Sequence, residues 1–477
     1  MNRFLSSLLV AGLCCLASSA HAAPTRPNAV VIMTDDLGYG DLGCTGSRQV
    51  VSPNIDRLAE QGVFFERAYA AAPMCGPSRM ALMTGRQPKR YGITVNPNWK
   101  HPDLPESRYG LPVTEKLLPE YLNPLGYTCG VVGKWHLGHT KGQTPTERGF
   151  ARWWGFLGGS RSYFPLAQEQ GGLNPSRIVS SYDENPKVTY LTDDVTREAV
   201  RFIREQSPEG KPFFLFVSYN APHWPMESLK EDREATRQHA EENGVPVPTG
   251  LRMHYCAMIH GVDRGVGRIM DALREQGLAD DTLVFFMSDN GGAPESPCSN
   301  APWRGHKRLH YEGGVRVPFL VSCVGTQQGK AWPKDLLVPG RRCGEIVSLM
   351  DILPTLLQLN DQPVPKTMDG RSMVPVLRGE SAGDRSLQWC TDQTNAILVG
   401  DWKLLRAKGV EPRLYCLGDD PGEKENRAKS QQKRLRDLSR ELDDYLESTP
   451  GPRYPDHESW GKKLLKEHKE AKTMPRY

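Results

Sequence analysis

Three short runs of almost uninterrupted apolar residues lie far apart in the chain, at residues 28–33, 213–217 and 282–287. They are rich in β-branched and aromatic side chains. Runs of this length without polar alternation are typical of strands buried on both faces of a largely parallel sheet. We therefore predict that the three segments are strands of one such sheet.

Polar residues follow each of these runs at once. Asp35 and Asp36 come after the first run, His223 comes shortly after the second, and Asp289 and Asn290 come after the third. In open α/β sheets, sites form just beyond the carboxyl ends of the strands. These side chains are therefore expected to meet at one edge of the sheet.

Helical periodicity lies between the apolar runs, at residues 54–61, 191–204, 255–275 and 351–359. The pattern predicts an α/β fold with a large, mixed but mostly parallel central sheet flanked by helices. The strongly charged residues 227–248 are expected to form a solvated insertion.

A second unit is expected to begin near residue 384. Three segments resemble strands of a small antiparallel sheet, and a polar helix follows them: 387–391, 396–405, 413–417 and 431–446. The predicted division is a catalytic domain over 23–383, a small α+β subdomain over 384–448 and a tail over 449–477. The tail is rich in Lys, Pro and Glu and is expected to be mobile.

The N-terminus has the pattern of a secretory signal peptide. Arg3 supplies a positive charge, residues 4–16 are mostly apolar, and residues 20–22 form a small-x-small cleavage site. The apolar run is too short for a membrane span. Residues 1–22 are therefore predicted to direct export, to a periplasm or to the outside; acylation at Cys14 or Cys15 is the alternative.

Composition narrows the classes of function. The chain of 477 residues has 38% hydrophobic and 24% charged residues and a net charge of +4. No strong overall field is expected, which argues against a dedicated nucleic-acid binder. The 11 cysteines show no Cys-x-x-Cys zinc pattern. Outside the signal peptide and the motif described next, they could be disulfides or buried thiols.

The most specific motif is AAPMCGPSRMALMTGR, at residues 71–86. It resembles the sulfatase signature Cys-x-Pro-Ser-Arg followed by Leu-x-Thr-Gly-Arg, with Cys75 and Arg79 at the first and fifth positions. A simpler reading is a helix-start turn in which Cys75 only packs. The resemblance implies that Cys75 is oxidised to 3-oxoalanine (formylglycine). The hydrate of this aldehyde would attack sulfur with one hydroxyl and expel sulfate with the second.

Further segments extend the resemblance to the type I, formylglycine-dependent sulfatases over residues 27–428. They are PNAVVIMTDDLGYGDLG from residue 27, GKWHLG from 133, APHWP from 221, FFMSDNGG from 285 and WRGHKRLHYEGGVRVP from 303. The family implies an alkaline-phosphatase-like fold and, for this chain, an exported bacterial carbohydrate sulfatase of the arylsulfatase-like kind.

The resemblance also implies a metal site and a set of catalytic roles. Ca²⁺ would be held by Asp35, Asp36, Asp289, Asn290 and the oxidised Cys75, a set of oxygen donors that suits a hard cation. Arg79 and Lys134 would stabilise the diol, and His136 would act as the base that releases sulfate. His223 and Lys307 would bind sulfate oxygens, with His223 also protonating the leaving alcohol.

The implied partners are a sulfated carbohydrate substrate and a formylglycine-generating enzyme. The substrate stays open, with a preference for sulfated galactose or N-acetylgalactosamine. Loops at 96–112, 155–172 and 227–248 are candidates for specificity. One alternative function is a formylglycine-dependent phosphodiester or phosphonate hydrolase. The other is an inactive protein that binds sulfated glycans.

Overall fold

The computed structural model describes residues 26–97, 104–105, 108–166, 175–325, 331–333, 335–454 and 458–472. The predicted signal peptide lies outside these ranges. Within them, no helix is both long and apolar enough to cross a membrane. The cysteines of the described residues are all free thiols, most of them buried.

A nine-stranded sheet forms the centre of the molecule, in the order β5-β4-β3-β6-β1-β7-β8-β2-β9. Its strands are β1 (Asn28–Thr34), β2 (Val63–Tyr69), β3 (Thr128–Lys134), β4 (Arg152–Phe156), β5 (Val179–Ser180), β6 (Phe213–Ser218), β7 (Thr282–Ser288), β8 (Phe319–Cys323) and β9 (Arg341–Ser348). The pairs β1·β6, β1·β7, β3·β6, β3·β4 and β2·β9 are parallel, and those formed by β5 and β8 are antiparallel. The prediction of a large, mostly parallel sheet is confirmed.

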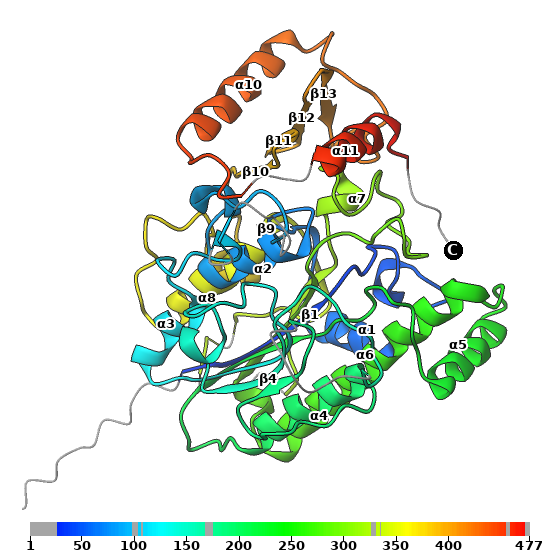
Figure 1. Cartoon of the computed structure of the whole chain (residues 1–477), viewed down its shortest axis with the longest axis vertical. Helices are drawn as coiled ribbons and strands as arrows, with labels where there is room; N and C mark the ends of the chain where they lie inside the picture. The colour runs from blue at the N-terminus through cyan, green and yellow to red at the C-terminus, as the bar shows by residue number, and fades with distance from the viewer. Residues whose placement is uncertain are drawn as a thin grey trace, which may run out of the picture.

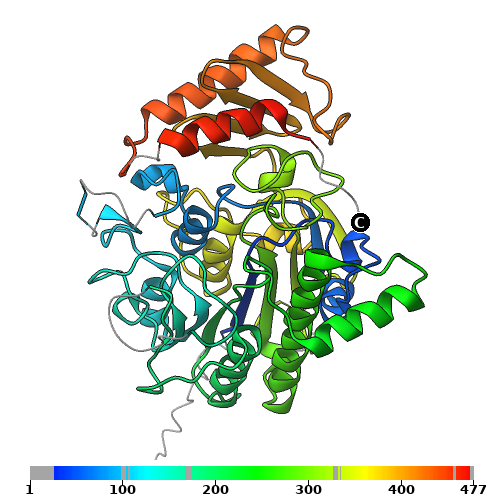
Figure 2. The same ribbon diagram turned by 45° about the vertical axis from the view of Figure 1, so that its right-hand side comes forward.

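Helices cover both faces of this sheet (Figures 1 and 2). The helices of this part of the chain are α1 (Pro53–Gln61), α2 (Cys75–Thr84), α3 (Leu118–Leu122), α4 (Leu191–Arg204), α5 (Lys230–Glu242), α6 (Gly250–Glu275), α7 (Glu312–Val315), α8 (Ile352–Leu359) and α9 (Val374–Leu377). Alternate residues of β1 belong to two cores: Val31 packs with residues of α2, α3 and α8, whereas Ile32 packs with residues of α1, α4 and α6. Burial on both faces explains why β1 has no polar alternation.

A second, antiparallel sheet follows in the order β10-β11-β12-β13 (Figure 1). Its strands are β10 (Ser386–Cys390), β11 (Thr394–Val399), β12 (Trp402–Ala407) and β13 (Val410–Cys416), and α10 (Gln432–Glu447) comes after them. The single strand predicted over 396–405 is wrong. Gly400 has a φ of 59°, which suits the tight turn that divides this segment into β11 and β12.

Two other expectations need correction. The segment 449–477 is not a tail without structure, because it contains α11 (Glu458–Glu470) and the buried Tyr454. The segment 227–248 is only partly solvated, because α5 is amphipathic and buries Asp232 and Ala240. In both cases a high density of charged residues masked a narrow buried face.

Candidate active site

The carboxyl ends of three neighbouring strands meet at one edge of the central sheet. Met33 of β1 pairs with Ser218 of β6, and Thr34 of β1 pairs with Ser288 of β7. The amide of Asp289 then donates to the carbonyl of Thr34 at 3.1 Å. The polar segments that follow the three apolar runs are therefore brought together, as the strand pattern predicts.

Cys75 is buried at the first position of α2, facing two of the acids. Ligand atoms of Asp35, Cys75 and Asp289 lie within 4.8 Å of one another. The Gly76 amide donates to the side-chain oxygen of Asn96 at 2.9 Å, and Cys75 Sγ lies 3.7 Å from the same oxygen. The sulfur marks the position at which the oxidised side chain would carry its oxygens.

Within the described part of the chain, two buried oxygens of this cluster have no hydrogen-bond partner: Asp35 Oδ1 and Asn290 Oδ1. The amide of Asn290 is already used, because it donates to Asp36 at 2.7 Å. Buried polar atoms are normally paired, so the two oxygens are free to coordinate a cation. Carboxylate and amide oxygens are the ligands that Ca²⁺ prefers. The residues present therefore fit the implied metal.

Each of the three acids is also paired with a buried cation. Lys134 donates to Asp35. Arg79 donates to Asp289 through Nε at 2.8 Å, and its Nη2 forms an ion pair with the same carboxylate oxygen at 2.7 Å. Lys307 Nζ contacts the two oxygens of Asp36 at 2.7 and 2.9 Å. All six side chains are almost completely buried.

The cations of the cluster do not act equally on Asp35 and Asp289. Burial opposes ionisation of Asp35, but Lys134, His223 and Arg79 hold the pKa of its carboxyl well below the ordinary value. Burial and the negative charge of Asp35 raise the pKa of Asp289, although Arg79 opposes this shift. Two carboxylates this close compete for the same positive charge, and an additional cation would relieve that competition.

The nearby lysines also change the pKa of the Cys75 thiol. Burial alone would raise the pKa of the Cys75 thiol, but Lys134 and Lys307 outweigh it and hold this pKa below its ordinary value. Arg79 lies one helical turn after Cys75, on the same face of α2. The cluster therefore favours an anionic group at the N-terminus of this helix, a position that the helix dipole also favours.

His136 follows β3 and is buried in a left-handed conformation, with a φ of 60°. Burial, together with the charges of Lys134 and Arg79, holds the pKa of its imidazole well below the ordinary value. Among the residues that the structure describes, its Nδ1 has no hydrogen-bond partner. A neutral imidazole with a free nitrogen can accept a proton. A Cβ at Gly159 would lie 2.9 Å from its Nε2, so the glycine makes room for the ring.

His223 lies at the outer side of the cluster. Its Nε2 is 3.6 Å from Asp36 Oδ2, and its side chain is 19% exposed. Its Nδ1 is 2.7 Å from the carbonyl of Trp224. Since the other cluster residues are more deeply buried, His223 is the most exposed side chain of the cluster.

The ten residues predicted for the site thus come together, and their individual roles stay predictions. Sequence reasoning missed the direct contact of Asn96 with α2, and it missed Ser218, whose hydroxyl accepts from Arg79 and donates to the Lys134 carbonyl at 2.6 Å. No motif marked either residue, although Ser218 directly follows an apolar run.

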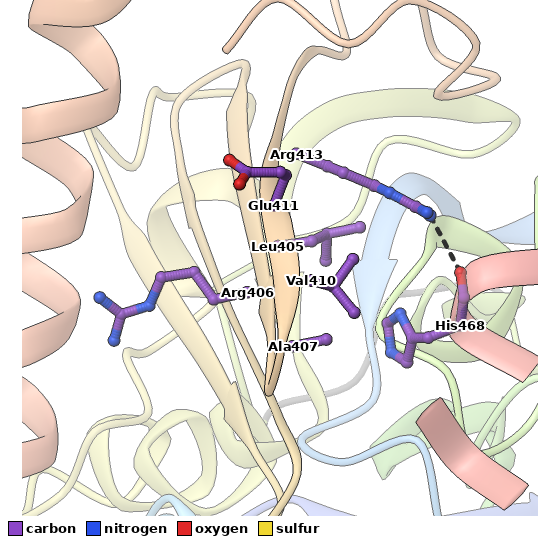
Figure 3. Close-up of a pocket in the computed structure, with 7 residues that line it drawn as sticks. All are labelled: Leu405, Arg406, Ala407, Val410, Glu411, Arg413 and His468. Carbon is purple, nitrogen blue, oxygen red and sulfur yellow. Dashed lines mark hydrogen bonds between the residues drawn. The ribbon is translucent and has the colours of Figure 1, made fainter. Parts of the chain in front are cut away.

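A hollow in the C-terminal unit lies apart from this cluster and contains none of the predicted residues (Figure 3). It is formed by the β12–β13 hairpin and α11, and its lining residues are Leu405, Arg406, Ala407, Val410, Glu411, Arg413 and His468. It contributes nothing to the site chemistry.

The fold and a comparison with known proteins together define the class of protein. The fold, with acids and cations beyond the carboxyl ends of β1, β6 and β7, is that of the alkaline-phosphatase-like hydrolases, and the Sulfatase family model matches residues 27–361. N-acetylgalactosamine-6-sulfatase of Mus musculus is 33% identical over 82% of this chain and 74% of its own length. Arylsulfatase A of Homo sapiens is 34% identical over 78% and 71%.

A solved structure agrees with the sequence relatives. Ps i-CgsB in complex with k-i-k-neocarrahexaose has a TM-score of 0.81 and 33% identity, covering 92% of this chain and 96% of its own. The chain therefore belongs to the sulfatase family, and it is a sulfuric ester hydrolase.

Proposed function

We propose that the protein hydrolyses sulfate esters on carbohydrates with a formylglycine made from Cys75 and a Ca²⁺ ion. The observation that carries this proposal is the position of Cys75. Its sulfur lies within 4.8 Å of ligand atoms of Asp35 and Asp289, at the start of α2 and under the positive charges of Lys134 and Lys307. A cysteine that only packed would need neither the acids nor the cations.

Ca²⁺ would be held by Asp35, Asp36, Asp289 and Asn290, together with an oxygen of the oxidised side chain. Bound there, the ion would withdraw charge from the sulfate oxygens, and the hydrated aldehyde would supply both the attacking and the expelling hydroxyl. The unpaired oxygens of Asp35 and Asn290 support this assignment.

The protein's own side chains would stabilise negative charge and transfer the two protons. Arg79, Lys134 and Lys307 present fixed positive charge to the sulfate and to the group at position 75. His223 holds a proton at Nε2 for the oxygen of the leaving alcohol. His136, kept neutral by burial and by neighbouring cations, accepts the proton released when sulfate departs.

The substrate class proposed is a sulfated galactose or N-acetylgalactosamine unit. Relatives named N-acetylgalactosamine-6-sulfatase support it, as does the neighbour solved with a neocarrahexaose. Export through residues 1–22, maturation by a formylglycine-generating enzyme and a division into 23–383, 384–448 and 449–477 belong to the same proposal. The last unit is then a helical segment that includes α11.

The test is turnover of a panel of defined sulfated mono- and oligosaccharides by the matured protein. The panel includes N-acetylgalactosamine 6-sulfate and neocarrahexaose sulfates, with sulfate release as the readout. Cys75→Ala is expected to abolish release, whereas Cys129→Ala, which removes a buried thiol outside the cluster, is expected to retain it. Sulfate release by Cys75→Ala at the wild-type rate would contradict the proposal.

The alternative of phosphodiester or phosphonate hydrolysis is less well supported. Such enzymes need a fuller two-metal donor set, whereas this cluster places Lys134 and Lys307 beside Asp35 and Asp36. A fixed cation there substitutes for a second metal. We expect an aryl sulfate to be hydrolysed with a higher kcat/KM than an aryl phosphodiester, and the reverse order would favour the alternative.

A further inference from the structure

Trp224 is conspicuously exposed for its residue type. Its exposed fraction is 49%, whereas Trp135, Trp154 and Trp389 are fully buried. Among the large apolar side chains that are exposed in the described ranges, the two aromatic ones are Trp224 and Phe164. A half-exposed indole leaves a broad apolar surface in water, and such surfaces mark binding sites.

The position of Trp224 ties it to the candidate active site. It directly follows His223, and its carbonyl is 2.7 Å from the Nδ1 of that ring, whose Nε2 is in turn 3.6 Å from Asp36. Consecutive Cα atoms are about 3.8 Å apart. The backbone position that carries the indole therefore lies next to the partly exposed outer side of the charged cluster.

The turn that carries Trp224 is held firmly from one side. The Tyr163 hydroxyl donates to the His223 carbonyl at 2.9 Å, and the Tyr163 amide donates to Glu227 at 2.7 Å. The Tyr190 hydroxyl donates to the Glu227 carbonyl at 3.0 Å. A braced backbone presents its side chain at low entropic cost, which is the condition for a preorganised contact.

The bracing segment carries the second exposed aromatic residue. Phe164 follows Tyr163 and is 38% exposed, and its ring centroid lies 5.4 Å from that of Tyr190. Two exposed aromatic residues thus belong to two segments that are hydrogen-bonded to each other. Exposed apolar residues that are scattered singly need no explanation, whereas two exposed aromatic residues on neighbouring segments beside the candidate active site indicate a binding surface.

We propose that Trp224 is a sugar-binding platform: its exposed indole stacks on the apolar face of the pyranose ring that carries the ester sulfate. The proposal rests on the proposed function and deepens it, because it names the part of the substrate that is recognised outside the sulfate pocket. A pyranose ring has one face made of C–H groups, and an indole is flat, apolar and electron-rich on its face. The two surfaces suit each other, while the hydroxyls at the ring edge stay free for polar contacts.

The cations of the site cannot by themselves distinguish a sulfated sugar from another sulfate ester. Lys134, Lys307 and Arg79 act on the sulfate and on the group at position 75, and the sulfate is common to every sulfate ester. Binding energy for the sugar must come from groups further out, and stacking supplies it without fixing the position of each hydroxyl. Trp224 therefore favours sulfated pyranosides over small alkyl sulfates.

The experiment compares wild type, Trp224→Ala and Trp224→Phe, with Leu251→Ala as the control. Leu251 is an exposed apolar residue at the start of α6, with a similar exposed fraction of 48%, and it lies outside the site. The probe is the panel sulfate that wild type hydrolyses with the highest kcat/KM. KM for this probe and the inhibition constant of free inorganic sulfate, which has no ring, are measured for each protein.

Trp224→Ala is expected to raise KM about tenfold, the size of an aromatic contact together with its buried area. The inhibition constant of inorganic sulfate and the circular dichroism spectrum should stay as in wild type, Trp224→Phe should recover most of the loss, and Leu251→Ala should match wild type. An unchanged KM in Trp224→Ala would overturn the platform while leaving sulfatase activity established. A wild type that turns over no member of the panel would instead remove the proposed function, and the platform with it.

Discussion

At the scale of single residues, the site is a set of buried charges in which each acid has its own cation. Asp35 is paired with Lys134, Asp36 with Lys307, and Asp289 with Arg79. Buried charges persist only when they are paired and hydrogen-bonded. The pairs therefore offset part of the cost of burying the three acids, while Asp35 Oδ1 keeps no hydrogen-bond partner among the described residues.

Metal binding is expected to stabilise the folded protein. A ligand at 100 times its Kd contributes about 2.7 kcal/mol, so Ca²⁺ added to the EDTA-treated protein should raise Tm by several degrees in calorimetry. Asp289→Asn weakens the donor set and should lose most of this rise. The same Tm with and without Ca²⁺ in wild type would argue against the assignment of the site.

His223 is expected to matter most for poor leaving groups. An alcohol needs a proton as it departs, whereas an activated aryl oxide does not. His223→Ala should lower kcat/KM for a sugar sulfate by about 100-fold, and for a nitrophenyl sulfate by much less. Equal losses on both substrates would show that His223 binds sulfate without acting as the acid.

The sequence could predict that these residues lie together, because each belongs to a short motif attached to a strand end or a helix start; their roles in catalysis and metal binding stay predictions. Asn96 and Ser218 escaped prediction for different reasons. Asn96 reaches α2 from a long loop whose path depends on tertiary packing, and a serine after an apolar strand carries no distinctive pattern. The candidate site residues are thus recognisable from short local motifs, whereas the contacts that Asn96 and Ser218 make with them depend on the tertiary structure.

At the scale of elements, the strands of the central sheet were predictable because burial on both faces leaves an uninterrupted apolar run. The C-terminal helix α11 was not, because most of its residues are charged and only a narrow face is buried. On that face His468 packs beside His310, with ring centroids 5.7 Å apart, and its carbonyl accepts from Arg413 at 2.9 Å. Tertiary contacts therefore contribute more to this helix than its own pattern does.

Docking of α11 is expected to weaken in acid. Burial, with the charges of Arg413 and Lys403, lowers the pKa of His468 from 6.5 to about 3. The folded protein then binds fewer protons than the unfolded chain, so the contribution of His468 is fully present above pH 6.5 and is lost as the pH falls towards 3. At pH 5 the loss is about 2 kcal/mol.

Limited proteolysis of the segment between α10 and α11 measures this effect. Wild type should become more susceptible between pH 7 and pH 5, and His468→Gln, which cannot take up the proton, should show a smaller change. Equal pH dependence in the two proteins would mean that His468 does not control the docking of α11.

At the scale of the whole molecule, the antiparallel sheet is packed on both faces. In β11, Ala396 and Leu398 join a core that includes Tyr69 and Leu309, whereas Ile397 faces the core formed with α10. Figure 2 shows α10 on the outer side of this sheet and the body of the molecule on the other. The C-terminal unit thus shares a core with the unit that carries the site.

A buried ion cluster joins the two units. Lys403 Nζ of β12 lies 2.7 Å from Glu312 of α7 and 3.1 Å from Glu423, and all three side chains are completely buried. Lys403→Met removes the cation shared by Glu312 and Glu423, of which Glu312 keeps Arg316 at 3.2 Å, and should cost about 3–5 kcal/mol, seen as a lower Tm. Lys408→Met changes an exposed lysine of the same hairpin and should have little effect. A similar Tm for both variants would contradict a joining role for the cluster.

The most direct test of the whole account is mass spectrometry of the peptide that contains Cys75, taken from preparations whose specific activity has been measured. Oxidation of the thiol to the aldehyde lowers the peptide mass and makes it react with a hydrazide. The account predicts that sulfatase activity rises in proportion to the converted fraction and is absent without conversion. Full activity in a preparation whose position 75 remains a thiol would contradict it.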